Sequence, residues 1–256
     1  MKIKLDTTKS LEQNAETYYN AAKKMKKKLG GAREAIKRTE EMLKKAEKEF
    51  AEEKPLLTKR ESVKKEWYEK FRWFFSSEGF LCIGGRDSTS NEIIIKKHME
   101  KEDIVFHTEM AGSPFFLIKT EGKKPGEKTL NEAAQATASF SRAWKLGMSA
   151  AEVFYVNPEQ VTKEAKAGEY ISKGAFMIYG KKNFIGADMK IAIGLKDGKL
   201  ISGPLDAIKP KADRFFVIAQ GDEKTSSLAK KLQKKLGFND LDEIIRMLPV
   251  GNCKIL

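Results

Sequence analysis

The N-terminal part of the chain carries a heptad pattern of apolar residues. The pattern runs from Leu11 to Phe50 at alternating spacings of four and three residues, and within it only Thr39 is not apolar. A pattern sustained over about five heptads is typical of a coiled-coil helix. Gly30 and Gly31 lie inside it without shifting its register, so we expect one continuous helix even though each glycine costs about 1 kcal/mol. The pattern positions are Leu11, Ala15, Tyr18, Ala22, Met25, Leu29, Ala32, Ile36, Thr39, Leu43, Ala46 and Phe50.

Pro55 ends this predicted helix, and an aromatic-rich segment follows it. Trp67, Phe71 and Phe74 recur at helical spacing, which predicts a second helix over residues 56–75. Two such helices would form an antiparallel coiled-coil hairpin, but the second is too short to cover the first. The uncovered part of the heptad pattern then needs another partner, either a second copy of this chain in a homodimer or a segment of a longer protein.

A short strand followed by a glycine pair, a charged pair and a helix start, here called the glycine corner, is the segment whose pattern most resembles a binding site. The apolar run at residues 80–83 predicts a buried strand. At the glycine pair 84–85 the backbone can turn at positive φ or be approached closely by neighbouring atoms. The charged pair Arg86-Asp87 comes next, and residues 88–91 include types that cap helices, which predicts a helix over 91–100. The β-branched run at 93–95 leaves a strand as the alternative for part of this segment. A helix N-terminus at this corner would offer free N–H groups to an anion.

The remaining pattern alternates between short strands and helices. An alanine-rich helix is expected to begin at Thr129, with capping-box spacing to Glu132, and to end at Gly147. An Asp-Gly turn at 197–198 predicts a β-hairpin, and the strands of this last part either extend the preceding sheet or form a small α/β lobe. The predicted fold class is α+β, with a long N-terminal coiled-coil helical hairpin followed by a mixed α/β domain. Strands are expected at residues 103–107, 115–119, 153–156, 190–195, 199–201 and 214–219, and helices at 225–236 and 240–248.

The charge of the chain is strongly positive and is concentrated near its start. The 256 residues hold 49 Lys and Arg against 36 Asp and Glu, a net charge of +13. Residues 1–65 contain 19 of these cations and 11 of the anions, and so contribute +8. Such a balance favours a polyanionic partner, either RNA or an anionic membrane surface. The alternative is a solvated, lysine-rich helix with no such partner.

Cysteine content and apolar segments narrow the class of protein. Two cysteines, Cys82 and Cys253, are too few for a disulfide framework or a metal cluster. The N-terminus has no apolar stretch of the kind found in secretory signals, and no segment is long enough to span a membrane. We therefore expect a cytoplasmic protein without a membrane partner, and not a secreted adhesin.

Several sequence blocks resemble the NFACT-R domain of the NFACT ribosome quality-control proteins, which are called NEMF in animals. The block Ile83-Gly84-Gly85-Arg86-Asp87 with Ser90-Asn91-Glu92 carries the resemblance most clearly. Residues 5–6 with 14–19 resemble the coiled-coil middle region of the same family. Thr108 and Glu109 replace the family's usual Ala and Asp, and Tyr179 stands where an Arg is common. Further similar blocks lie at residues 66–74, 107–113, 143–145, 160–163, 168–170 and 174–184.

The resemblance implies an organisation and a function. It divides the chain into a coiled-coil middle region at 1–65, an NFACT-R domain at 66–188 and a C-terminal α/β extension at 189–256. By the same resemblance the chain is either the C-terminal portion of a longer protein or a natural short form. The resemblance further implies RNA binding and docking onto large ribosomal subunits that carry stalled nascent chains. In that family the full-length protein handles tRNA and supports C-terminal tailing of the stalled chain.

Candidate RNA-binding residues follow from the charged groups within these blocks. Lys and Arg side chains would contact the phosphate backbone and give salt-dependent affinity that is largely independent of sequence. Asp87 is expected to orient Arg86 rather than to meet a phosphate, and the cluster at 96–98 also suits the negative end of a helix dipole. The candidates are Arg86, Asp87, Lys96, Lys97, His107, Lys163, Lys181, Lys182 and Asn183.

Two alternatives belong to other functional classes. Asp87, His107 and Glu109 could converge as an acid–base or metal group in a phosphoester-processing enzyme. The sequence has no metal-ligand spacing, phosphate loop or nucleophile elbow, so we expect neither enzymatic activity nor a cofactor or metal. The other alternative is a structural coiled-coil dimerisation module with no role in nucleic-acid binding.

Overall fold

The computed structural model of the chain describes residues 4–52, 66–164 and 171–256, except for the side chains of residues 45–52. The chain divides into two compact units, Met1–Lys64 and Lys65–Leu256, which are described separately. Among the described residues, no helix combines the length and the apolar character needed to cross a membrane.

The first unit contains the long helix that the heptad pattern predicts. Helix α1 spans Leu11–Glu52, 42 residues, and continues unbroken through Gly30 and Gly31. Asn14 fixes its start, because the side-chain amide exchanges hydrogen bonds with the backbone N–H and carbonyl of Asp6. The predicted hairpin is not confirmed. Apolar side chains of the heptad pattern lie exposed at Leu11, Tyr18, Met25, Leu29, Ile36 and Leu43.

The predicted second helix is wrong where the structure describes it. Residues 72–75 form strand β1 (Arg72–Phe75), which pairs antiparallel with β2 (Leu81–Gly84), and residues 56–65 lie outside the described part of the chain. The helical spacing of the aromatic residues is overridden by pairing in a sheet, where neighbouring side chains face opposite ways. Phe74 accordingly packs into the core on one side of the sheet, and Trp73 packs on the other.

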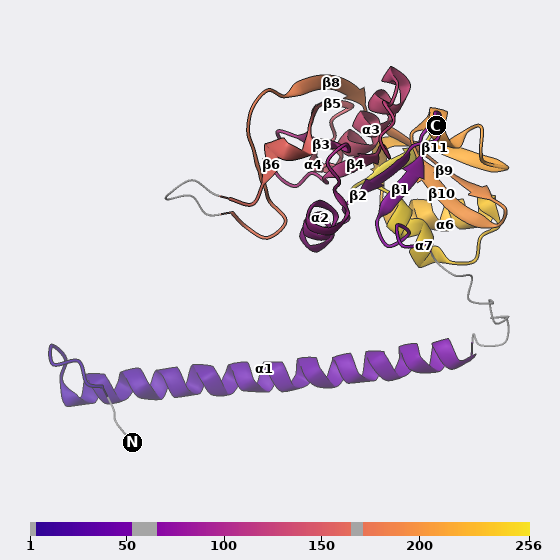
Figure 1. Ribbon diagram of the computed structural model, residues 1–256. Helices are drawn as coiled ribbons and strands as arrows, with labels where there is room; N and C mark the ends of the chain where they lie inside the picture. Colours follow the sequence, from indigo (N-terminus) through magenta and orange to yellow (C-terminus); the bar gives the residue numbers. More distant parts are fainter. Residues whose placement is uncertain (1–3, 53–65, 165–170) are drawn as a thin grey trace. The chain divides into compact units, whose positions relative to one another are not determined.

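The strands of the second unit's larger sheet follow the order β1-β2-β4-β3-β5-β8, with every neighbouring pair antiparallel (Figure 1). The strands expected at 103–107, 115–119 and 153–156 are confirmed, with each end within three residues of its expected position. A separate short pair lies in the segment between β5 and β8. The remaining bounds are β3 Ile104–Thr108, β4 Phe116–Lys119, β5 Ala150–Val156, β6 Val161–Thr162, β7 Met177–Ile178 and β8 Asn183–Asp188.

Both faces of this sheet are covered, so its central strand β4 is buried on both sides. Helix α2 (Ser88–Ile93) continues into a π-helical turn, η1 (Ile94–His98), and two isoleucines of that turn pack with Leu117 of β4. On the other face, Phe116 and Ile118 pack with the alanines of α3 (Glu127–Ser139). The predicted alanine-rich helix is thereby confirmed, and its small side chains lie buried against the sheet.

The predicted ends of the alanine-rich helix are wrong. It begins two residues earlier, with Gly126 at the N-cap position. The Thr129 hydroxyl donates to the Glu78 carboxylate and also bonds the Ser76 hydroxyl, instead of capping the helix. Helix α3 stops before Phe140, and a separate short helix, α4 (Arg142–Lys145), follows it.

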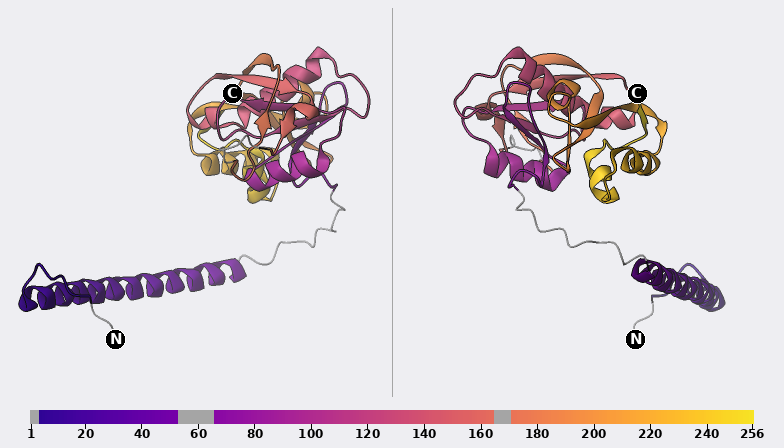
Figure 2. Two further views of the ribbon diagram at one scale, coloured as in Figure 1. Left: turned by 60° about the vertical axis from the view of Figure 1, so that its left-hand side comes forward. Right: turned by 90° about the vertical axis from the view of Figure 1, so that its right-hand side faces the viewer.

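The C-terminal strands form a second sheet, with the order β10-β9-β11-β12, rather than extending the first. Asp197 and Gly198 both have positive φ and form the predicted hairpin turn. Helix α3 contacts strands of both sheets (Figure 1, Figure 2). One hydrophobic cluster includes buried residues of both sheets, among them Phe116 and Ile193. The bounds are β9 Lys190–Lys196, β10 Lys199–Gly203, α5 Leu205–Ile208, β11 Arg214–Glu223, α6 Thr225–Leu236, α7 Leu241–Met247 and β12 Cys253–Ile255.

Candidate nucleic-acid interface

The glycine pair at the strand end is required by close packing. A Cβ added at Gly84 would lie 2.3 Å from the ring of Phe116, and one added at Gly85 would lie 1.8 Å from Asn91 Oδ1. Asn91 Oδ1 accepts a hydrogen bond from the Phe115 N–H at 3.1 Å. Neither glycine has positive φ. Of the two explanations offered by the sequence, close approach is confirmed and the positive-φ turn is wrong.

The guanidinium of Arg86 is directed toward the protein. Its Nη2 donates to the Phe71 carbonyl at 2.9 Å, and Nη1 donates to the Arg246 carbonyl at 3.4 Å. Burial lowers the pKa of Arg86, and the nearby charge of Arg246 lowers it further. Nε is buried and has no hydrogen-bond partner among the described residues. Arg86 therefore ties the corner to the residue before β1 and to helix α7.

Asp87 caps the following helix. Its Oδ1 accepts from the Ser90 N–H at 2.8 Å, and the Ser90 hydroxyl oxygen accepts from the Asp87 N–H at 2.9 Å, which completes a capping box. The hydrogen bond from the Ser90 N–H is the largest cause of the lowered pKa of Asp87. One of the N–H groups that the sequence offered to an anion is thus already bound by the protein's own carboxylate.

Lys96 and Lys163 share one carboxylate. The Lys96 ammonium lies 2.7 Å from Glu92 Oε1, and that of Lys163 lies 3.7 Å from Glu92 Oε2. The contact with Lys96 is the largest cause that lowers the pKa of Glu92 to about 2. Lys163 also donates to the carbonyls of Ser172 and Ala175 at 2.9 and 2.8 Å, so it is tied to the segment 172–175. Lys97, next to this group, is exposed.

His107 lies on strand β3, and its side chain packs against aromatic residues. Its ring stacks on Phe115 with 4.2 Å between the centroids, and Nδ1–H donates to the Thr108 carbonyl at 2.6 Å. Burial lowers the pKa of His107. With Arg86 and Asp87 it lines a cavity of about 370 Å³. The structure therefore brings three of the candidate residues to one cavity.

Asn183 begins β8, one of the two edge strands of the larger sheet, and Lys181 and Lys182 directly precede it. Lys182 forms an ion pair with Glu109, and its ammonium lies 4.5 Å from the centre of the Phe154 ring. Asn183 is exposed, and its side chain reaches the Tyr155 carbonyl only at 3.5 Å. Lys181 is exposed and makes no ion pair with the described residues.

Sequence reasoning missed two cations at the corner. Lys173 lines the same cavity as His107, and its charge contributes to the lowered pKa of Asp87. Its place directly before Gly174, the start of one of the recognised blocks, was the only signal for it. Arg246 comes from the C-terminal part of the chain, and no local pattern indicates that it lies near Arg86.

The residues of the enzyme hypothesis have separate partners. Asp87 caps α2, His107 stacks on Phe115, and Glu109 pairs with Lys182. In the part of the chain that the structure describes, no group of three or more His, Cys, Asp or Glu side chains is arranged to hold a metal ion.

Comparison with known families assigns the central part of the chain. The family model described as the NFACT protein RNA binding domain matches residues 70–180. The chain belongs to the NFACT family. The match includes the glycine corner, His107 and Lys163, whereas Lys181, Lys182 and Asn183 follow directly after its end.

Curated relatives support the assignment. The Archaeal Rqc2 homolog aRqcH of Methanocaldococcus jannaschii is 38% identical over 214 residues, which cover 80% of this chain and 32% of that protein. The human Ribosome quality control complex subunit NEMF is 38% identical over 177 residues, 67% of this chain and 16% of that protein. The chain thus spans about a third of the archaeal relative and less than a fifth of the human one.

A solved structure is also similar. It is the C-terminal part of the fibronectin/fibrinogen-binding protein from Streptococcus suis, with a TM-score of 0.40 and 16% identity, covering 70% of this chain and 76% of that chain. A likeness at this level does not by itself establish a shared fold.

Proposed function

We propose that this chain is the RNA-binding module of a cytoplasmic ribosome quality-control factor. It would dock onto large ribosomal subunits that carry stalled nascent chains, in a protein that handles tRNA and supports C-terminal tailing. The observation that carries the proposal is the match of residues 70–180 to the NFACT RNA-binding domain, supported by the fly and human relatives that are named as ribosome quality-control complex subunits. The division of the chain into a coiled-coil region, an NFACT-R domain and a C-terminal extension, with boundaries after residues 65 and 188, is also part of this proposal.

The candidate residues fall into two groups, those that can contact RNA directly and those that position the RNA-binding surface. Lys97, Lys181 and Asn183 are exposed and can reach a phosphate backbone. Lys96 and Lys182 can do the same once they exchange a carboxylate partner for a phosphate. Arg86, Asp87, His107 and Lys163 instead shape the corner by bonds to the protein, and we assign them to positioning the binding surface.

Salt dependence of RNA binding tests the proposal. The 256-residue chain is titrated into a fluorescent rRNA stem-loop at several salt concentrations. Each phosphate contact contributes about −0.7 to −0.9 to the slope of log affinity against log salt. Lys181→Glu/Lys182→Glu should lower the affinity and flatten the slope by about two contacts. The matched variant Lys123→Glu/Lys124→Glu, in the loop before α3, changes the charge equally and should retain the slope. A wild-type affinity that does not respond to salt would contradict the proposal.

The exposed heptad pattern supports a second candidate function, homodimerisation through α1. Met25 and Ile36 lie 70% and 59% exposed on the isolated helix, where a coiled coil would bury them. Sedimentation equilibrium tests this candidate. A mass near twice 28.9 kDa that returns to the monomer value in Met25→Glu/Ile36→Glu supports it, and a monomer at every concentration argues against it.

A further inference from the structure

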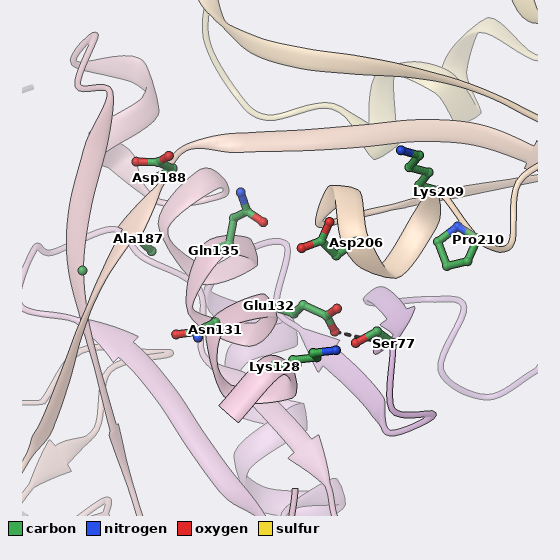
Figure 3. A pocket seen from close by; sticks show the side chains of 11 residues that line it. Ser77, Lys128, Asn131, Glu132, Gln135, Ala187, Asp188, Asp206, Lys209 and Pro210 are labelled. Carbon is green, nitrogen blue, oxygen red and sulfur yellow. Dashed lines mark hydrogen bonds between the residues drawn. The ribbon is translucent and has the colours of Figure 1, made fainter. Parts of the chain in front are cut away.

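A second and larger cavity lies away from the glycine corner. It has a volume of about 910 Å³ and lies between the N-terminal half of α3, the end of β8 and helix α5 (Figure 3). None of the candidate RNA-binding residues lines it. The side chains that define it are Ser77, Glu132, Gln135, Asp188, Asp206 and Lys209.

Glu132 contributes a buried, incompletely hydrogen-bonded carboxylate to this cavity. The residue is only 5% exposed, and its Oε2 accepts a hydrogen bond from the Ser77 N–H at 2.9 Å. Oε1 is buried and has no partner among the described residues. Figure 3 shows the carboxylate directed into the space between α3 and α5. A buried carboxylate oxygen without a hydrogen bond is costly, and a donor from a ligand would remove that cost.

The charged side chains that line the cavity include more acidic than basic residues. Glu132, Asp188 and Asp206 line it against Lys128 and Lys209, although Lys and Arg outnumber Asp and Glu in the whole chain. In the part of the chain that the structure describes, none of these five side chains forms an ion pair with another. Burial raises the pKa of Glu132, whereas the hydrogen bonds from Ser77 and the charge of Lys211 lower it, and the charge of Asp206 raises it slightly.

The spacing of the carboxylates selects the kind of cation. They come from three elements, α3, β8 and α5, and no three acidic side chains among the described residues are close enough for a metal ion. An organic cation with a methylene chain can instead meet carboxylates that lie apart. Ala187 and Pro210 offer apolar surface to such a chain, and the Gln135 amide can accept a further hydrogen bond.

We propose that this cavity binds an alkylammonium group, with the ammonium held between Glu132 and Asp206. The group can belong to a free polyamine or to a lysine side chain of a partner protein. This site is independent of the proposed RNA-binding surface. Occupancy would link α3, which contacts strands of both sheets, to α5, which packs mainly on β9 and β10 of the smaller sheet.

Calorimetric titration of the 256-residue chain tests the site, with spermidine as one probe and a neutral-capped peptide containing two lysines as the other. We expect saturable one-to-one binding of at least one probe. Asp206→Asn and Glu132→Gln should each weaken it at least fivefold, while Glu127→Gln should leave it unchanged. Glu127 is the matched control because it lies exposed in the first turn of the same helix and does not line the cavity.

The two probes also separate the sources of the cation. Tighter binding of spermidine points to a free polyamine, and tighter binding of the peptide points to a protein lysine. If the Glu132→Gln variant does not fold, the binding measured with Asp206→Asn still tests the proposal, because Asp206 is exposed and its replacement leaves the core intact. Failure of both probes to saturate, equal affinity in all variants, or saturable binding of inorganic phosphate lost in Lys209→Gln would overturn the proposal.

Discussion

Lys182 and Glu109 form an ion pair, with 2.6 Å between Nζ and Oε1, at the start of the outer strand β8. The Lys182 side chain is 26% exposed and that of Glu109 is 60% exposed. The neighbouring Lys181 is exposed and is not paired in this way within the described residues. The cationic surface proposed here therefore has less available charge than its sequence suggests.

Removing Glu109 should strengthen RNA binding. In Glu109→Gln the ammonium of Lys182 is free to meet a phosphate, and a nearby negative charge is lost. We expect the affinity for RNA to rise by roughly two- to fivefold at low salt and the gain to shrink as salt screens the charges. Fluorescence anisotropy measures it, with Asp242→Asn on α7 as the control for net charge. An unchanged or lower affinity would place the RNA elsewhere.

A methyl group at Gly85 should damage the corner. In Gly85→Ala the new Cβ collides with Asn91 Oδ1, which already accepts from the Phe115 N–H. We expect a loss of about 1–3 kcal/mol in the free energy of unfolding, measured by urea denaturation. Gly186→Ala serves as the control, because a Cβ there has no atom within 4 Å. Equal effects of the two substitutions would mean that the close approach at Gly85 is not needed.

The buried pair of Lys119 and Asp103 should matter far more than a surface pair. The ammonium lies 2.6 Å from Asp103 Oδ2, with the two side chains 8% and 1% exposed. Lys119→Met leaves the Asp103 charge buried without its cation, so we expect a loss of about 3–5 kcal/mol in the free energy of unfolding. Lys101→Met, an exposed neighbour, should change it by less than about 0.5 kcal/mol. A loss below about 1 kcal/mol for Lys119→Met would refute this reasoning.

The two histidines should make stability depend on pH. Burial lowers the pKa of both His98 and His107 in the folded protein. The unfolded chain therefore binds these protons at a higher pH, and the free energy of unfolding should fall as the pH drops below about 6.5. Denaturant titrations between pH 7.5 and 5.5 measure the slope. His98→Gln/His107→Asn should flatten it, and a slope that survives this double substitution must have another source.

Local patterns predicted the elements whose side chains follow one clear period. The heptad pattern of α1, the Asp-Gly hairpin and the apolar strand before the glycine pair all appear where the sequence placed them. Strand β1 was predicted as a helix because Trp67, Phe71 and Phe74 happen to recur at helical spacing. Only pairing with β2, which no local pattern reports, turns residues 72–75 into a strand.

The candidate site was predictable in its residues but not in their partners. Arg86 and Lys163 look like free cations in the sequence. The Arg86 side chain, however, binds a carbonyl oxygen of the distant helix α7, and the Lys163 side chain binds carbonyl oxygens 9 and 12 residues further along the chain. Asp87 is next to Arg86 in the sequence, but its side chain caps the N-terminus of helix α2. Sequence reasoning sees which groups are charged, whereas the fold decides which of them remain free for a ligand.

Crosslinking to large ribosomal subunits that carry a stalled nascent chain is the most direct test of the central claim. We predict that the wild-type protein crosslinks to rRNA on these particles and that Lys181→Glu/Lys182→Glu reduces the yield at least fivefold, while Lys123→Glu/Lys124→Glu crosslinks like the wild type. Equal crosslinking of all three proteins would contradict the proposed RNA-binding surface at the start of β8, and no crosslinking of the wild type would contradict docking itself.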